Sequence, residues 1–145
     1  MSWDPYVGSV ISSSCEKGDD QQPIAGTNHC DTAILIGLNG AIWCTPGAPG
    51  VLKIDQGEAM KIATAIASDS ETEFQMNGVH IGGIKYRYLR KTEDIYVAKC
   101  KDQGMITMKK SKQAIIIAQQ IEGKAIGNVN GAVKNIAEYL ENLGY

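Results

Sequence analysis

Apolar residues recur along this chain with two spacings, one typical of helices and the other typical of strands. Near the beginning, apolar positions three or four residues apart predict a helix over Trp3–Ser12, with Pro5 suited to its first turn. The same spacing predicts helices over Ile54–Ala67 and Val129–Leu143, and Gly144 fits the end of the last one. The pattern therefore places a helix near each end of the chain and one in between.

Other apolar runs are short and bounded by Gly, Pro, Asn or Asp, which predicts strands. Asn39-Gly40 lies between two such runs and predicts a hairpin of Thr32–Leu38 and Ala41–Thr45. Five further strands are predicted at Val79–Ile81, Ile84–Leu89, Asp94–Cys100, Met105–Lys109 and Gln113–Gln119. Short turns separate the first four, which indicates a meander, and the apolar run 114–118 indicates a strand buried on both faces.

The order helix, hairpin, helix, meander, helix predicts an α+β fold with a mostly antiparallel central sheet. The length of 145 residues fits a single domain over 1–145. The polar segment Ser13–Asp31 is predicted to be a loop. Because it is long for a compact domain, we interpret it as an insertion or a functional loop.

Four of the nine aromatic residues lie near the two ends of the chain: Trp3, Tyr6, Tyr139 and Tyr145. Terminal segments are usually polar and frayed unless something holds them. Packing of the first helix against the last would bring these rings together. Partly covered rings suit proline-rich peptides, whose stiff extended helix packs against aromatic grooves.

Composition indicates a soluble globular protein, with 43% hydrophobic and 21% charged residues. No apolar run approaches the roughly 18 residues that span a membrane, and the first residues show no secretory signal. The four cysteines are few and irregularly spaced. We therefore expect a cytosolic protein with reduced thiols.

Charge is unevenly distributed, although the net charge is only −2. Nine basic and three acidic residues lie between Lys85 and Lys112, so this segment is +6 and the remainder is −8. A basic face predicts an acidic protein, an anionic lipid surface or a nucleic acid as partner, and a solvated face is the alternative. Tyrosines within the segment fit a single-strand nucleic-acid binder. The acidic pI of about 5.6 argues against that class, and we predict no nucleic-acid partner.

Catalytic chemistry is poorly supported by the sequence. His29 and His80 have no partner pattern, and Cys15, His29 and Cys30 lack both a fourth ligand and a standard spacing for zinc. The glycines of segment 78–83 lie among strands, where turn glycines are expected rather than a phosphate loop. We predict no enzyme activity, metal or cofactor. A redox protein using Cys15 and Cys30 is the rival interpretation, and it predicts thiols that react near neutral pH.

Five segments, in this order, carry a family resemblance: the opening Met1-Ser2-Trp3 with Tyr6, Ala33–Trp43 (AILIGLNGAIW), Asn77–Arg90 (NGVHIGGIKYRYLR), Ile106–Ala118 (ITMKKSKQAIIIA) and Ile136–Tyr145 (IAEYLENLGY). Together they resemble the profilins, a family of small actin-monomer-binding proteins, over nearly the whole length of the chain. The resemblance implies that the terminal helices pack together on one face of the sheet, with a further helix on the other face. It also implies binding functions without catalysis.

The resemblance assigns residues to three binding surfaces. The implied proline-binding groove consists of Trp3, Tyr6, Trp43, Tyr139, Leu140 and Tyr145. The implied actin-binding face consists of Met76, Lys85, Tyr88, Arg90, Lys99, Lys101, Gly127 and Asn130. Candidates for binding phosphoinositide head groups at a membrane surface are Arg87, Arg90, Lys109, Lys110 and Lys112.

The function implied by the resemblance is that of a cytoplasmic, cytoskeleton-associated monomer. It would bind monomeric actin and the proline-rich tracts of actin elongation factors, and so regulate actin polymerisation. The alternative is a proline-peptide adaptor that does not bind actin. Two features depart from the family: the loop Ser13–Asp31 is longer, and Ala125 stands where some profilins carry a histidine at the actin face.

Overall fold

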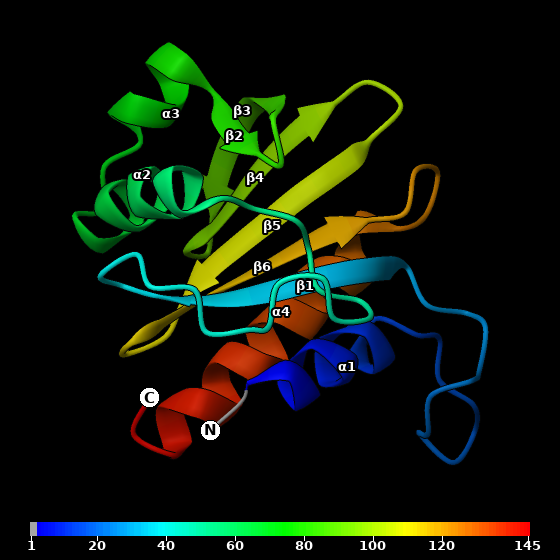
Figure 1. The fold of residues 1–145 in the computed structure, drawn as a ribbon. Helices are drawn as coiled ribbons and strands as arrows, with labels where there is room; N and C mark the ends of the chain where they lie inside the picture. The colour runs from blue at the N-terminus through cyan, green and yellow to red at the C-terminus, as the bar shows by residue number, and fades with distance from the viewer. Residues whose placement is uncertain (1–2) are drawn as a thin grey trace.

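A six-stranded antiparallel sheet, in the order β1-β6-β5-β4-β3-β2, forms the middle of the molecule (Figure 1). The computed structural model describes residues 3–145, so Met1 and Ser2 from the first segment of the resemblance lie outside the described residues. The strands are β1 Cys30–Gly37, β2 Val79–Ile81, β3 Ile84–Thr92, β4 Ile95–Cys100, β5 Gly104–Lys110 and β6 Ala114–Gln120. Neighbours in the sequence from β2 to β6 are also neighbours in the sheet, which confirms the predicted meander.

Helices cover both faces of this sheet (Figure 1). Helices α1 (Asp4–Ser13) and α4 (Ile126–Asn142) lie side by side on one face, against β1, β5 and β6. Helices α2 (Gln56–Ala67) and α3 (Thr72–Asn77) lie on the other face. The α+β fold class and the pairing of the terminal helices are therefore confirmed, whereas the short helix α3 was not predicted from the sequence.

The start of α2 is fixed by a reciprocal pair of hydrogen bonds. Asp55 Oδ1 accepts from the Glu58 N–H at 2.7 Å, and Glu58 Oε1 accepts from the Asp55 N–H at 3.0 Å. The Glu58 carboxylate also accepts from the Gly82 and Gly83 N–H groups, at 2.7 and 2.9 Å. One side chain thus caps the helix and attaches it to the turn between β2 and β3.

The core lies between the two helical layers, and β6 runs through it. All residues of segment 114–118 are buried, which confirms a strand covered on both faces. Val129, Val133 and Leu140 of α4 cover one face, and Ile62 and Ile66 of α2 belong to the same core on the other face. Full burial of an isoleucine side chain contributes about 2 kcal/mol relative to exposure. The buried strand β6 therefore accounts for a large part of the stability.

The predicted hairpin forms, but its second arm is shorter than predicted. The Gly37 N–H donates to the Ala41 O at 2.8 Å, the Trp43 N–H donates to the Leu35 O at 3.1 Å, and Ile42 makes one isolated bridge between them. Beyond this pairing, the Thr45 N–H donates to Asp4 Oδ1 of α1 at 2.7 Å.

The next part of the same edge of β1 is covered by residues 50–52. The Ala33 N–H donates to the Gly50 O at 2.9 Å, and the Leu52 N–H donates to the Ala33 O at the same distance. A segment that follows the predicted hairpin therefore covers this edge for a short length.

The segment between α1 and β1 is a projecting loop, as predicted (Figure 1). Its regular pairing is limited to one bridge between Lys17 and Pro23 within the described residues. Ser14 Oγ closes its base by accepting from the His29 and Cys30 N–H groups at 3.1 and 3.2 Å. The loop is thus held at its base, whereas its tip lies away from the sheet.

Candidate functional site

Aromatic rings from three parts of the chain meet beside the paired helices α1 and α4. The ring centroid of Trp3 lies 4.7 Å from that of Trp43, 5.2 Å from that of Tyr6 and 5.0 Å from that of Tyr145. Tyr6 in turn lies 6.2 Å from Tyr139 of α4. These separations are typical of interacting aromatic pairs. We call the five rings the aromatic trough.

Hydrogen bonds to main-chain atoms hold the outer members of the aromatic trough in place. The Tyr145 carbonyl O accepts from Ser111 Oγ at 2.7 Å and from the Gln113 N–H, both in the turn between β5 and β6. The Tyr145 N–H donates to the Leu140 O at 2.8 Å. On the other side, the Asp4–Thr45 hydrogen bond attaches the segment that carries Trp43 to the start of α1. Tyr145 is thus attached to the turn between β5 and β6 and to α4.

Exposure differs sharply among the residues predicted for the proline-binding groove. Tyr139 and Tyr145 are 53% and 37% exposed, whereas the Leu140 side chain is fully buried and supports the trough from within the core. A groove of about 440 Å³ continues beyond Tyr6 and Tyr139 and is also lined by Pro5, Ser9 and Ile136. The sequence analysis missed these three residues. Their spacing was a usable signal, since Ser9 and Ile136 lie three residues from Tyr6 and Tyr139 on the same helices.

Basic side chains gather at a second place, on strands β3 and β4. Arg87 and Lys99 are cross-strand partners, and an open cavity of about 690 Å³ is lined by Lys85, Arg87, Leu89, Lys99, Cys100, Lys101, Asp102 and Glu122. We call this the basic cavity. Of the predicted actin-binding residues, it brings Lys85, Lys99 and Lys101 together.

Arg90 and Asn130 line a separate, smaller cavity of about 260 Å³ between β3, β4 and α4. Asn130 Oδ1 accepts from Thr107 Oγ1 at 2.8 Å, which fixes the amide against β5. Gly127 is exposed in the first turn of α4. The first turns of α4 and the strands β3 and β4 thus present the predicted residues on the α4 side of the sheet.

Tyr88 and Met76 do not join this group, in contrast to the sequence-based expectation. The ring of Tyr88 packs 5.5 Å from Phe74 of α3, and its hydroxyl donates to Glu71, so Tyr88 points to the opposite face. Burial, with the hydrogen bond to Glu71, raises the pKa of Tyr88. Met76 is 75% exposed but belongs to α3 on that same face. The sheet therefore separates both residues from the basic cavity.

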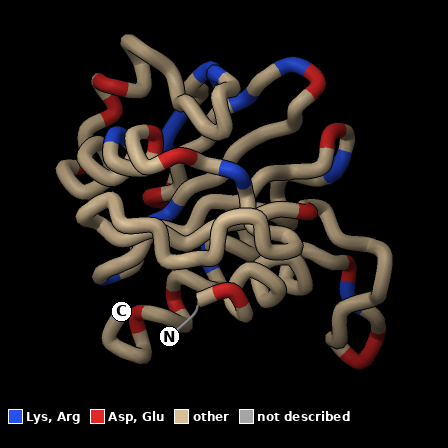
Figure 2. Tube along the Cα trace, viewed as in Figure 1, with Lys and Arg blue, Asp and Glu red and all other residues tan. Residues whose placement is uncertain are grey.

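The residues predicted to bind phosphoinositides are also dispersed. Lys110 Nζ lies 2.8 Å from Asp69 Oδ1, which follows α2, and the Lys110 hydrogen bond lowers the pKa of the Asp69 carboxyl. Arg87 lines the basic cavity, whereas Lys112 lies in the turn between β5 and β6 beside the aromatic trough. Figure 2 shows basic residues spread over several edges of the molecule. No single patch brings the predicted five together within the described residues.

The thiols do not form the reactive pair that the redox interpretation requires. Cys15, Cys30 and Cys44 are buried, and burial raises the pKa of Cys30 and of Cys44. His29 Nδ1 accepts a hydrogen bond from the Ala125 N–H at 3.0 Å. Within residues 3–145, no three His, Cys, Asp or Glu side chains are grouped to hold a metal ion. In the same range, no helix is long and apolar enough to cross a membrane.

Comparison with known proteins finds relatives over the whole length of this chain. A family model described as Profilin matches residues 1–145. The profilins of the sea urchin Clypeaster japonicus and the sponge Suberites domuncula are each 40% identical over 146 residues, with 99% of both chains covered.

Solved profilin structures share the fold. Acanthamoeba castellanii profilin IA has a TM-score of 0.75 at 20% identity, covering 99% of this chain and 100% of its own. Mouse profilin IIa, solved in complex with a double repeat from the FH1 domain of mDia1, has a TM-score of 0.69 at 19% identity, covering all of both chains.

The fold and the paired terminal helices are those of the solved profilin structures. The whole-length family match and the relatives at 40% identity are decisive for the family: this chain belongs to the profilins. Profilins are a non-enzymatic family of actin-binding regulators of actin polymerisation. Family membership thus confirms the resemblance found in the sequence.

Proposed function

We propose that this protein binds monomeric actin through the α4 side of its sheet and proline-rich segments of actin elongation factors through the aromatic trough. The observation that carries the proposal is the packing of the Trp3 ring against three other rings, all within 5.2 Å. A rigid row of half-exposed rings fits the flat faces of a polyproline helix, which loses little conformational entropy on binding. The FH1 complex of mouse profilin IIa supports this ligand class.

The two ligands would occupy different parts of the molecule. The aromatic trough lies where α1 and α4 meet the turn between β5 and β6, whereas the basic cavity lies on β3 and β4. A positive surface of this kind favours an acidic partner and speeds its encounter. We infer that one monomer holds actin and a proline segment together, in the cytoplasm, and so delivers actin to growing filaments.

Phosphoinositide binding is proposed at the basic cavity rather than at the dispersed set predicted from the sequence. Four of its lining side chains are basic, which suits a polyphosphate head group. Lipid and actin would then compete. Cosedimentation with vesicles that contain phosphatidylinositol bisphosphate, with and without actin, tests this, and vesicle binding that actin leaves unchanged would contradict a shared site.

Tryptophan fluorescence titrated with polyproline tests the trough, because the only two tryptophans, Trp3 and Trp43, both belong to it. We expect a saturable change that is lost in Tyr139→Ala and kept in Leu89→Ala, a control at an exposed apolar residue of the basic cavity. Wild-type fluorescence that does not respond to polyproline would refute the proline-binding function.

Actin-monomer binding is tested separately, by the rate of actin polymerisation. Wild-type protein that leaves this rate unchanged while still binding polyproline would favour the adaptor alternative.

A further inference from the structure

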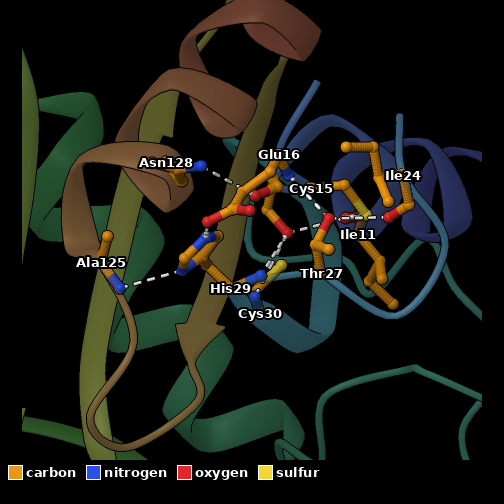
Figure 3. A network of polar contacts seen from close by, with 10 residues as sticks. Ile11, Cys15, Glu16, Ile24, Thr27, His29, Cys30, Ala125 and Asn128 are labelled. Carbon is orange, nitrogen blue, oxygen red and sulfur yellow. Dashed lines mark hydrogen bonds and ion pairs between the residues drawn. The ribbon is translucent and has the colours of Figure 1, made fainter. Parts of the chain in front are cut away.

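A network of hydrogen bonds joins the long loop to the start of α4, and His29 lies at its centre (Figure 3). His29 Nδ1 accepts from the Ala125 N–H at 3.0 Å, and the His29 carbonyl O accepts from the Ile121 N–H at 2.8 Å. His29 is only 9% exposed. Because Ile121 and Ala125 border the turn between β6 and α4, one residue of the loop holds this turn at both of its ends.

Ser14 extends the same network to the end of α1. Its hydroxyl oxygen accepts from the His29 and Cys30 N–H groups, and its carbonyl O accepts from Asn128 Nδ2 at 3.2 Å. Ala125 is the N-cap of α4, and its own side chain makes no capping hydrogen bond. The beginning of α4 is therefore positioned from outside, by His29, which lies 96 positions before Ala125, and by Ser14, which lies 114 positions before Asn128.

The bond to Ala125 requires one particular state of the His29 ring. Nδ1 can accept only when it carries no proton, so the ring is neutral and its proton sits on Nε2. Nε2 faces the Glu16 carboxylate at 3.9 Å, and that side chain is 62% exposed. Protonation of Nδ1 turns the acceptor into a donor that points at the Ala125 N–H, and the bond between them is then lost.

Few other charged groups surround the ring. The titratable side chains of the neighbouring segments are Cys15 and Glu16 of the loop, Cys30 and Asp31 of β1, and Glu122 and Lys124 of the turn before α4. The last turn of α1 has no basic residue, and the first turn of α4 has no acidic one. Within the described residues, Glu16 is the one acidic side chain that lies within 4 Å of the ring nitrogens.

We propose that His29 is a positioning residue for the first turn of α4, and that protonation of its ring releases this turn. The functional part of the proposal rests on the proposed actin-binding surface, because the released turn carries Gly127 and precedes Asn130. In this proposal, the projecting loop places a histidine beside the start of α4, whose own sequence contains none.

Hydrogen exchange of backbone amides tests the positioning role without actin. His80→Asn serves as the reference, because the chain has only two histidines and His29 is then the sole one. In this background, His29→Asn offers an oxygen acceptor near the position of Nδ1 and does not titrate, whereas His29→Leu has no acceptor. At pH 7.5 we expect the Ala125 amide to exchange about fivefold faster in the leucine variant, as for the loss of one hydrogen bond, and within about twofold of the reference in the asparagine variant.

The pH dependence of the same amide tests the release. After correction for the intrinsic effect of pH on exchange, lowering the pH from 7.5 to 5.5 should reduce Ala125 protection in the reference protein but not in the asparagine variant. If Ala125 protection in the reference protein and in the asparagine variant stays equal between pH 7.5 and 5.5, the proposed release of the turn by protonation is overturned. Equal protection in the leucine variant and the reference at pH 7.5 would overturn the positioning role. If the leucine variant does not fold, the pH dependence of Ala125 protection in the reference protein and in the asparagine variant still tests the proposal.

Actin-monomer affinity connects the network to function. At pH 7.5 we expect an affinity about fivefold weaker in the leucine variant and within about twofold of the reference in the asparagine variant. At pH 6.0 the asparagine variant also controls for the pH sensitivity of actin itself. If no protein binds actin, wild type included, the proposed function fails while the exchange result stands. If wild type and the leucine variant bind equally well, the role of His29 in actin binding is refuted.

Discussion

The aromatic trough and the basic cavity are both open to solvent, but they are built in opposite ways. In the trough, each ring contacts another ring, and the backbone of Tyr145 is hydrogen-bonded to the sheet. In the basic cavity, Lys85, Arg87, Lys99 and Lys101 form no ion pair within residues 3–145. The aromatic trough is therefore preorganised for direct contact with a ligand. The basic cavity acts mainly through its electrostatic field. This difference predicts that the two surfaces respond differently to mutation, salt and strain.

The largest effect is expected from Gly104→Ala at the start of β5, just after Lys101 and Asp102 of the basic cavity. Gly104 has φ +80°, and an added Cβ would collide with the Gln120 backbone oxygen. We expect the free energy of unfolding to fall by about 2–4 kcal/mol. Urea unfolding measures this, with Gly123→Ala as a control, because it has a similar φ of +86° and open space around it. Equal losses in the two variants would mean that backbone conformation, not the collision, sets the cost.

Trp3→Ala should be the most damaging change within the trough. It removes the ring that contacts Tyr6, Trp43 and Tyr145 together. Aromatic residues at the centre of an interface often contribute about 2–4 kcal/mol, so polyproline affinity should fall at least 30-fold. Calorimetry with a proline-rich peptide gives the value, and actin affinity in the same protein is the control. A parallel loss of actin affinity would mean that the two surfaces are not independent.

Charge reversal in the basic cavity should give a smaller, salt-dependent effect. For Lys99→Glu with Lys101→Glu, we expect the association rate with actin to fall about tenfold at low salt, with little change in the dissociation rate. The difference should shrink as salt is added, because salt screens exposed charges. Stopped-flow mixing measures both rates.

The control for this charge reversal is Lys53→Glu with Lys61→Glu, since both residues are exposed away from the basic cavity. If high salt leaves the fall in association rate unchanged, the basic cavity does not act through its electrostatic field.

The smallest effect concerns the Asp69 carboxylate, whose pKa is lowered by its hydrogen bond with Lys110. A pKa that is lower in the folded protein stabilises the fold above the ordinary carboxyl pKa of about 3.9. This stabilisation is lost as the pH falls through the folded value. Asp69→Asn should therefore flatten the acid limb of a stability–pH curve without changing its shape near neutral pH. An unchanged acid limb would show that this ion pair contributes nothing measurable.

Local patterns predicted most of the fold. Apolar spacing located helices α1, α2 and α4, and β2 was predicted with its observed bounds of Val79–Ile81. Helix α3 was missed because its six residues bury only Phe74 and carry no apolar stripe. The strand predicted over Ala41–Thr45 pairs with β1 only as far as Trp43, and Thr45 is hydrogen-bonded instead to Asp4, which lies about forty residues away. Such a contact leaves no trace in a local pattern.

The basic surface shows why site residues were harder to predict than elements. Strict alternation along β3 puts Tyr88 and Arg90 on one face. A break in register between them, at Leu89, turns Arg90 to the α4 side while Tyr88 stays against α3. Nothing in the sequence marks this bulge. The aromatic trough was easier to predict, because its rings are few and its helices pair in the expected way.

The outer side of β1 is one margin of the sheet, and it is covered by short pieces of chain. Residues 41–43 and 50–52 hydrogen-bond along it. Long unpaired strands are templates on which a second molecule can add its own strand. The covered outer side of β1 therefore leaves little backbone on which a second copy of this chain could extend the sheet at that margin.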